Sequence, residues 1–252
     1  MKFKIYFTIF TMFVLANACK AIEEKSNLDE KAISQKTDEL VEKYIALDIF
    51  SGVVLIAEDG KAFYKKAFGL ADRENNISNK LNTKFDIGSM NKTFTKVVVY
   101  QLIEEGKLKL DDKLGNYLEG FPKESTEKIT IENLLNHSSG YGDYHSPEYF
   151  ALPKEKKTIN GLLQIIKNLP LNFEPGTDQD YSNAGYILLG GIIEKVTGKS
   201  YYENVRERIT ETLGLNETYL EKKDQVPDRA IGYFKNAKGE IDRFEIFSTQ
   251  TM

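Results

Sequence analysis

The pattern of hydrophobic and polar positions predicts a helix and then a strand hairpin near the start of the chain. Apolar residues in 28–46 recur at the three- and four-residue spacing of an amphipathic helix. Two β-rich runs then lie on either side of Asp59 and Gly60, within residues 52–69. Asp-Gly between such runs strongly favours a two-residue hairpin turn. We therefore expect an antiparallel hairpin over 52–69.

The middle of the chain carries the spacing and the end signals of several helices. A polar, loop-like stretch over 71–86 precedes them. Helices are expected over 90–105, over 131–136 with Thr130 as N-cap, over 158–168, over 184–197 closed by Gly198, and over 201–213, with a short helix or turn over 111–118. Two short β-like runs surround 237–239. This order of hairpin, helical block and strands predicts an α/β (α+β) fold.

The first residues have the features of an export signal. Lys2 and Lys4 precede an apolar run over 5–15, which is too short to span a membrane comfortably. Residues 16–18 then have the small-x-small pattern of a signal-peptidase site. We therefore expect a signal peptide over 1–18, a polar tether over 19–27 and a folded domain over 28–252.

The only cysteine, Cys19, comes directly after this segment. Cleavage before Cys19 would release a secreted or periplasmic protein, whereas lipidation of Cys19 would anchor a cell-envelope lipoprotein in the membrane. Ala16 stands where lipoprotein signals usually carry Leu, which argues against lipidation. Retention of a single thiol at this position argues for it. In both cases we expect an exported protein without an internal disulfide.

Composition narrows the possible chemistry. The formal net charge is −4, and no basic stripe or nucleic-acid-binding motif is present, so we expect no nucleic-acid partner. Two histidines and one cysteine make a three-ligand catalytic zinc site difficult to build. We therefore expect chemistry without a metal or another cofactor.

A nucleophile and a basic residue occur together at the start of the 90–105 helix. Ser89 and Lys92 are three residues apart, so both side chains lie on one helix face. A serine hydroxyl is a weak nucleophile until a neighbouring base takes its proton. A buried, neutral Lys92 amine could be that base, and the Ser89 N–H could face a developing oxyanion. The four-residue pattern alone is short enough to occur by chance.

A second short pattern, Tyr181-Ser182-Asn183, precedes the apolar 184–197 helix. The Tyr181 phenol could pass a proton to a leaving group, since a Lys92 ammonium would stabilise its phenolate form. The Asn183 amide could hold a substrate amide. Tyr181 is one of 14 tyrosines, most of which we expect to be packing residues.

Together these patterns resemble the class C β-lactamase-related branch of the serine β-lactamase and penicillin-binding-protein superfamily. The resemblance covers about 50–220 and rests on segments 85–95, 134–141, 173–177, 181–186, 188–190 and 196–198, in the family's order. It implies a β-lactamase/transpeptidase-like fold, in which helices flank an antiparallel sheet and form a helical subdomain. It also implies that Ser89 is the acylated nucleophile, that Lys92 and Tyr181 form its base pair, and that Asn183 contacts substrate.

The chain departs from the family's pattern near its end. The family's third motif, Lys or His followed by x-Gly on a core strand, has no candidate after Asn183. Val196-Thr197-Gly198 shares only Thr-Gly and is expected to end a helix. The sequence stops at Met252, about where the family continues into further sheet strands. We therefore expect a C-terminally truncated member that lacks those strands.

Three interpretations follow from these patterns. The first is a serine hydrolase that cleaves amide, β-lactam or ester carbonyls of a small-molecule or peptide substrate through an acyl-enzyme, as β-lactamases, D-peptidases and esterases do. The second is a penicillin-binding-like module that binds ligand without turnover. The third is a chain that does not fold stably alone. Neither histidine is expected to join a Ser-His-Asp triad, because no G-x-S-x-G segment occurs. His137 is expected to be a structural loop residue, and His145 could line the site.

Overall fold

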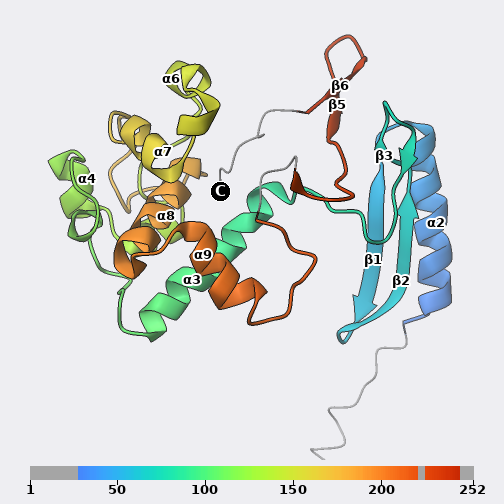
Figure 1. The fold of residues 1–252 in the computed structure, drawn as a ribbon, viewed down its shortest axis with the longest axis horizontal. Helices are drawn as coiled ribbons and strands as arrows, with labels where there is room; N and C mark the ends of the chain where they lie inside the picture. Colours follow the sequence, from blue (N-terminus) through green and yellow to red (C-terminus); the bar gives the residue numbers. More distant parts are fainter. Residues whose placement is uncertain (1–27, 221–224, 245–252) are drawn as a thin grey trace, which may run out of the picture. The chain divides into compact units, whose positions relative to one another are not determined.

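The computed structural model describes residues 28–220 and 225–244, which divide into two compact units. The first unit contains the described residues up to Leu70 together with Asn76–Leu81, and the second contains Ala71–Asn75 and the described residues from Asn82 onward. Both units appear in Figure 1, and each is described separately below.

The first unit is a helix and a hairpin, drawn in blue and cyan in Figure 1. Helix α2 spans Glu30–Ala46, strand β1 spans Gly52–Glu58 and strand β2 spans Lys61–Phe68. The strands pair antiparallel, and a bulge interrupts their register. Asp59 and Gly60 have φ angles of 48° and 75°, the left-handed conformation that a type I′ turn requires at both central positions. The predicted hairpin is therefore confirmed.

A small core and a polar contact hold α2 on the hairpin. Val41 of α2 is buried with Tyr64 and Phe68 of β2. Beside them, the Tyr64 hydroxyl and the Lys66 ammonium donate to Asp38 Oδ1 at 2.8 and 2.7 Å. Of the apolar positions predicted for this helix, Val41 and Ile45 pack on the hairpin, whereas Leu28, Leu40 and Tyr44 are exposed.

The polar stretch after the hairpin contains two short strands, β3 (Leu70–Asp72) and β4 (Ile77–Ser78), where the sequence predicts only loop. Strands of two or three residues are too short to show an alternation of apolar and polar positions, so the pattern could not reveal them.

The second unit is mainly helical. Its helices are α3 (Lys92–Glu104), α4 (Lys123–Lys128), α5 (Ile131–Leu135), α6 (Pro147–Ala151), α7 (Ile159–Ile166), α8 (Asn183–Thr197) and α9 (Tyr201–Val205). Short 3-10 turns occupy Gly88–Asn91, Leu114–Asn116 and Lys154–Lys156, and a π-helical turn occupies Arg206–Thr210. Strands β5 (Tyr233–Lys235) and β6 (Ile241–Arg243) form an antiparallel hairpin.

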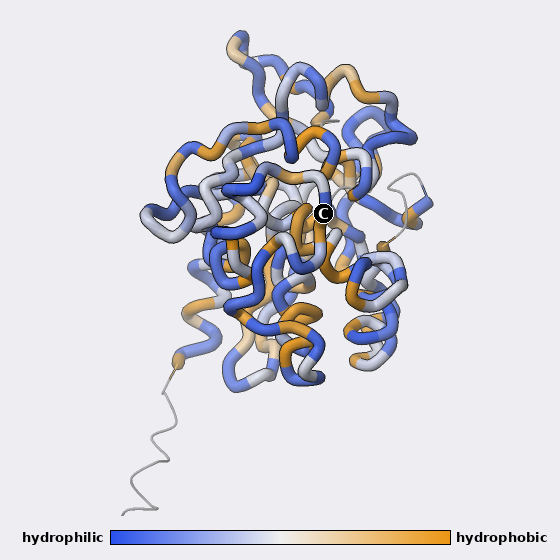
Figure 2. The backbone as a smooth tube through the Cα atoms, turned by 90° about the vertical axis from the view of Figure 1, so that its left-hand side faces the viewer, coloured by the Kyte–Doolittle hydropathy of each residue, from blue (hydrophilic) through white to orange (hydrophobic). Residues whose placement is uncertain are grey.

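Helix α8 is the centre of this unit. Every residue from Ala184 to Ile193 is buried, and α3, α5, α7 and α9 pack against the helix. Figure 2 shows hydrophobic and hydrophilic residues alternating along much of the backbone, as expected where elements have one buried face. Gly198 ends α8 with a φ of 69°, so the Thr197-Gly198 dipeptide closes a helix, as predicted. Among the described residues, no helix is long and apolar enough to cross a membrane.

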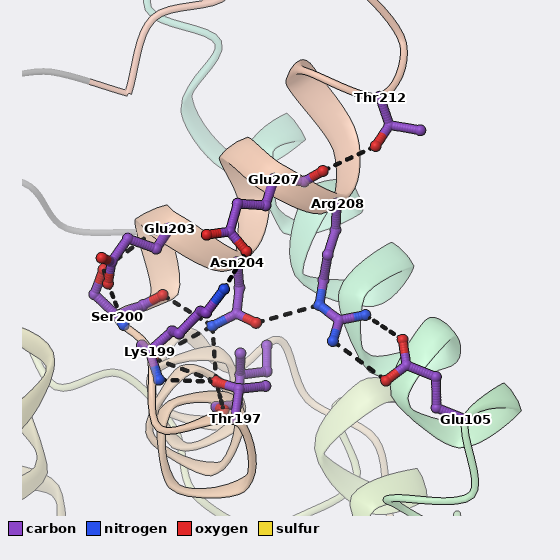
Figure 3. Close-up of polar contacts among 10 residues, drawn as sticks. Glu105, Thr197, Lys199, Ser200, Glu203, Asn204, Glu207, Arg208 and Thr212 are labelled. Carbon is purple, nitrogen blue, oxygen red and sulfur yellow. Dashed lines mark hydrogen bonds and ion pairs between the residues drawn. The ribbon is translucent and has the colours of Figure 1, made fainter.

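The sequence does not predict helices α4 and α6, and the helix that it predicts over 201–213 is only partly α-helical. The short helices α4 and α6 have only five or six residues each, which is less than two turns of periodicity. The helix predicted over 201–213 begins as α9 and continues as the π-helical turn. That turn lies beside a polar cluster that joins α8, α9 and the end of α3 (Figure 3).

Asn204 is the centre of this polar cluster and is 1% exposed. Its Nδ2 donates to Thr197 Oγ1 at 2.9 Å and to the Ser200 carbonyl at 2.9 Å. Its Oδ1 accepts from Arg208 Nε at 3.2 Å, and the Arg208 guanidinium also pairs with Glu105. Asn204 therefore connects the end of α8 to the π-helical turn and, through Arg208, to α3.

We expect Asn204→Ala to lower the free energy of unfolding by about 2–3 kcal/mol, because it leaves buried polar groups without partners. Lys199→Ala is the control, since it removes only the exposed Lys199–Glu207 ion pair, which is worth about 0–1 kcal/mol. Urea unfolding monitored by circular dichroism measures both values. Equal losses in the two variants would contradict a special role for Asn204.

Candidate active site

Ser89 and Lys92 lie where a 3-10 turn leads into α3. Ser89 belongs to the turn Gly88–Asn91 and is exposed, and Lys92 is the first residue of α3. Gly88 has a φ of 51°, and its N–H donates to Asp86 Oδ1 at 2.9 Å. The Lys92 side chain extends back along the turn, so that its Nζ lies 3.4 Å from Ser89 Oγ. The sequence predicts an ordinary helix from residue 90, whereas the tighter 3-10 turn comes first.

Tyr181 and Asn183 flank the residue that caps α8. Ser182 is fully buried, and its Oγ accepts from the Gly185 N–H at 2.9 Å, which is the usual contact of an N-cap. The same hydroxyl donates to the Gly142 carbonyl at 3.1 Å. These two hydrogen bonds fix the backbone at Ser182. They therefore also fix the positions from which the Tyr181 and Asn183 side chains extend.

The structure brings the four predicted residues of the site together. The Tyr181 hydroxyl donates to Ser89 Oγ at 2.8 Å. Lys92 Nζ donates to Asn183 Oδ1 at 2.8 Å, in addition to its contact with Ser89. Residues 91 or more positions apart in sequence thus form one hydrogen-bonded group. This arrangement places a phenol and an amine beside one exposed hydroxyl, and an amide beside the amine.

Lys92 is buried, with 8% of its surface exposed, and among the described residues no carboxylate pairs with it. Its Nζ instead lies 5.0 Å from the ring centre of Tyr181 and 5.4 Å from that of Tyr186. Aromatic faces attract cations, most strongly where water is excluded. The positive charge of Lys92 is therefore stabilised by dipoles and ring faces and stays available to a negative charge that forms beside it.

The Tyr181 phenol is the group on which this charge acts. Burial tends to raise the pKa of the Tyr181 phenol, but its hydrogen bonds with Lys92 and Ser89 and the positive charge of Lys92 outweigh this effect. The pKa of Tyr181 is therefore lower than that of an ordinary tyrosine. A lowered pKa increases the share of phenolate at a given pH, and the phenolate is the form that can accept the Ser89 proton.

His137 supports the turn that carries Tyr181. It has a φ of 58°, and its Nδ1 accepts from the Ser182 N–H at 3.1 Å. Its ring stacks on Tyr181 with centres 4.8 Å apart and lies against Tyr186 at 5.1 Å. Burial, followed by the charges of Lys92 and Lys96, lowers the pKa of the imidazole. These contacts suit a structural residue, as the sequence predicts.

The structure describes His145, but it does not describe Cys19 or the predicted signal peptide. His145 lies in the loop before α6, where its Nδ1 is 2.6 Å from Asp143 Oδ1. Cys19, the lipidation candidate, and the whole predicted signal peptide lie outside the described residues, so export and anchoring stay predictions. Among the described residues, no group of three or more His, Cys, Asp or Glu side chains could hold a metal ion.

Sequence reasoning missed the residues that hold the site in place. Ser182 could have been found as an N-cap, because a serine directly before a strongly apolar helix is a standard start signal. Gly142 could not be found from the sequence, because it contacts Ser182 through its backbone carbonyl, which every residue type has. The sequence predicts His137 as a loop residue. Its contact with the Ser182 N–H forms only when two segments distant in sequence come together, which the sequence does not show.

We expect the Tyr181 phenol to ionise below the ordinary pKa of about 10. Lys92→Met removes the stabilising hydrogen bond and charge, so the pKa of Tyr181 should rise. Lys96→Met is the control, because Lys96 lies on the same helix but is not among the groups that lower this pKa. Ultraviolet titration of each protein, with the same protein carrying Tyr181→Phe subtracted, isolates this phenol. An unchanged midpoint in Lys92→Met would contradict the coupling.

Comparison with known proteins agrees with this geometry. The chain is 35% identical over 198 residues to a penicillin-binding protein of Bacillus subtilis, and 33% identical over 202 residues to the teichoic acid D-alanine hydrolase of Staphylococcus aureus. These matches cover 76% and 79% of the chain but only 43% and 48% of the two relatives, so the chain spans about half of their length.

A solved class C β-lactamase superimposes with a TM-score of 0.71 and 27% identity, over 90% of this chain and 60% of that one. The predicted β-lactamase/transpeptidase-like fold is therefore confirmed. The β-lactamase family model matches residues 37–246, which include both halves of the site. The chain belongs to the β-lactamase family.

Proposed function

We propose that the chain is a serine hydrolase that cleaves an ester, amide or lactam carbonyl through an acyl-enzyme on Ser89. One observation carries this proposal. Ser89 Oγ is hydrogen-bonded to a phenol whose pKa is lowered, and a buried lysine without a carboxylate partner contacts both the serine and the face of that phenol. This is the arrangement that activates a hydroxyl, because the base and the charge that stabilises it are already in position.

Acylation would begin with Tyr181 in its phenolate form, which takes the proton of Ser89. Ser89 Oγ forms a bond to the carbonyl carbon, and the carbonyl electrons move onto its oxygen. The helix dipole of α3, which starts at this point, favours negative charge nearby. When the intermediate collapses, the bond to the leaving group breaks, and Tyr181 returns the proton to that group.

Deacylation would use the same groups in reverse. Water attacks the acyl carbon while Tyr181 accepts a proton from it, and Ser89 recovers the proton as the acid product leaves. Lys92 stays a cation throughout, so that each phenolate stage is stabilised by the same buried charge. Asn183, whose Oδ1 accepts from Lys92, keeps its amide N–H groups available for a substrate oxygen.

The names of the relatives support this range of carbonyl chemistry. They describe a penicillin-binding protein, a hydrolase of D-alanine on teichoic acid and a β-lactamase. A D-alanyl ester, a D-amino-acid peptide and a β-lactam all present a carbonyl to a serine, so each is a candidate substrate class.

Covalent labelling tests the nucleophile. A fluorescent fluorophosphonate should label the native chain and leave Ser89→Ala unlabelled. Tyr181→Phe should label about 10²–10⁴ times more slowly, because proton transfer loses its base. Tyr100→Phe is the matched control, since Tyr100 is 49% exposed and Tyr181 is 51% exposed. Equal labelling of the native chain and Ser89→Ala would exclude Ser89 as the nucleophile.

The same labelling separates a hydrolase from a module that binds without turnover. Intact mass spectrometry after addition of benzylpenicillin should show an acyl adduct on the native chain that decays with time. A bound ligand that never gives an adduct would favour the non-catalytic alternative.

A further inference from the structure

A single carboxylate, Asp143, lies on the loop that is bonded to the Tyr181–Asn183 turn. We propose that Asp143 recognises an ammonium group next to the reacting carbonyl, so that the preferred substrates are aminoacyl esters or amides with a free amine. This inference rests on the proposed function and specifies in addition that the substrate carries a positive charge.

Backbone contacts place Asp143 beside the site. The carbonyl of Gly142, the preceding residue, accepts from Ser182 Oγ at 3.1 Å and from the Ala184 N–H at 3.3 Å. These two donors are the direct neighbours of Asn183 in the chain. The negative charge of Asp143 also acts on the Tyr181 phenol, whose pKa it tends to raise. The carboxylate is therefore close enough to influence the group that handles the proton.

The carboxylate is held in one orientation by His145. Asp143 Oδ1 accepts from the His145 N–H at 3.3 Å and lies 2.6 Å from His145 Nδ1. The imidazole stacks on buried Tyr144 with ring centres 4.6 Å apart and meets the edge of buried Tyr149 at 4.7 Å. Because the ring is fixed by packing, the carboxylate that it holds is fixed as well.

The second oxygen of Asp143 is left for a ligand. Both contacts fall on Oδ1, and within the described part of the chain Oδ2 has no hydrogen bond. The Asp143 side chain is 50% exposed. A surface carboxylate is usually hydrated and free to rotate. Here the packed imidazole of His145 orients it, and the backbone beside it is hydrogen-bonded to the Tyr181–Asn183 turn.

The charge balance of the site favours a cation over an anion as the ligand of Asp143. The unpaired Lys92 would repel a substrate ammonium, and an oppositely charged group nearby is needed to offset that repulsion. An anionic substituent in the same place would meet the Asp143 carboxylate instead. The proposed specificity is therefore the difference in binding free energy between substrates with a cationic and with an anionic substituent at this position. A neutral substituent would be neither attracted nor repelled by Asp143.

Binding of two matched amides tests the proposal without relying on turnover. N-benzyl-D-alaninamide carries an ammonium where N-benzylisobutyramide carries a methyl group, and neither is an activated ester. At a pH of about 6.5 the amine is protonated. Calorimetric titration of Ser89→Ala should give a roughly tenfold lower Kd for the alaninamide, the difference that a hydrogen bond to a charged group provides. Asp143→Asn in the same background should abolish that preference.

Two further variants separate recognition from structure. Asp180→Asn removes a negative charge next to Tyr181 in the sequence and should leave the preference intact. His145→Phe keeps an aromatic ring but loses Nδ1, so the preference should fall, and His145→Asn should restore part of it. Equal Kd values for the two amides in the Ser89→Ala chain would overturn the proposal. So would a preference that survives Asp143→Asn. Neither result depends on whether fluorophosphonate labels Ser89.

Discussion

A buried lysine without a carboxylate partner is the constraint on which the site depends. Desolvating an ammonium is costly, and the cost must be offset by fixed dipoles, hydrogen bonds or ring faces. Lys92 obtains these from Ser89, Asn183, Tyr181 and Tyr186. A carboxylate would neutralise the charge more simply, but it would also weaken the effect of that charge on the pKa of the Tyr181 phenol. The absence of such a partner among the described residues therefore matters as much as the contacts that are present.

The constraint connects the site to the core of the second unit. Lys92 begins α3 and Asn183 begins α8, and these helices pack directly against each other through buried aliphatic residues. The distance between the amine and the amide is therefore set by helix packing and not by a flexible loop. Ser182 adds a local anchor, since its one buried hydroxyl both caps α8 and holds the 140–146 loop. Burial, capping and the geometry of the candidate site thus come from the same few positions.

The sequence could bring the four residues into one group because their segments resemble the family's motifs, and because each residue lies at the start of a strongly patterned helix. Ser89 and Lys92 lie just before an apolar stripe, and Tyr181 and Asn183 lie at the start of the long apolar segment 184–197. The hairpin was equally clear, owing to its Asp-Gly turn. What could not be predicted depends on contacts between distant segments, such as the carbonyl of Gly142 on the capping hydroxyl. The short helices α4 and α6 contain too few turns to show a period, whereas the equally short α5 could be predicted from its N-cap, Thr130.

The π-helical turn at Arg206–Thr210 has a consequence for how the chain tolerates changes in length. A π-helical turn contains more residues than an α-helical one, so deletion of a single residue there would allow an ordinary α-helix to continue from α9. The wide turn absorbs the extra residue, so the residues that follow would keep nearly the same side of the helix axis after such a deletion. A deletion in the regular turn of α9 would instead rotate the following residues by about 100°, and Arg208 would then point away from Asn204 and Glu105. The π-helical turn should therefore accept the loss of one residue more readily than α9 does.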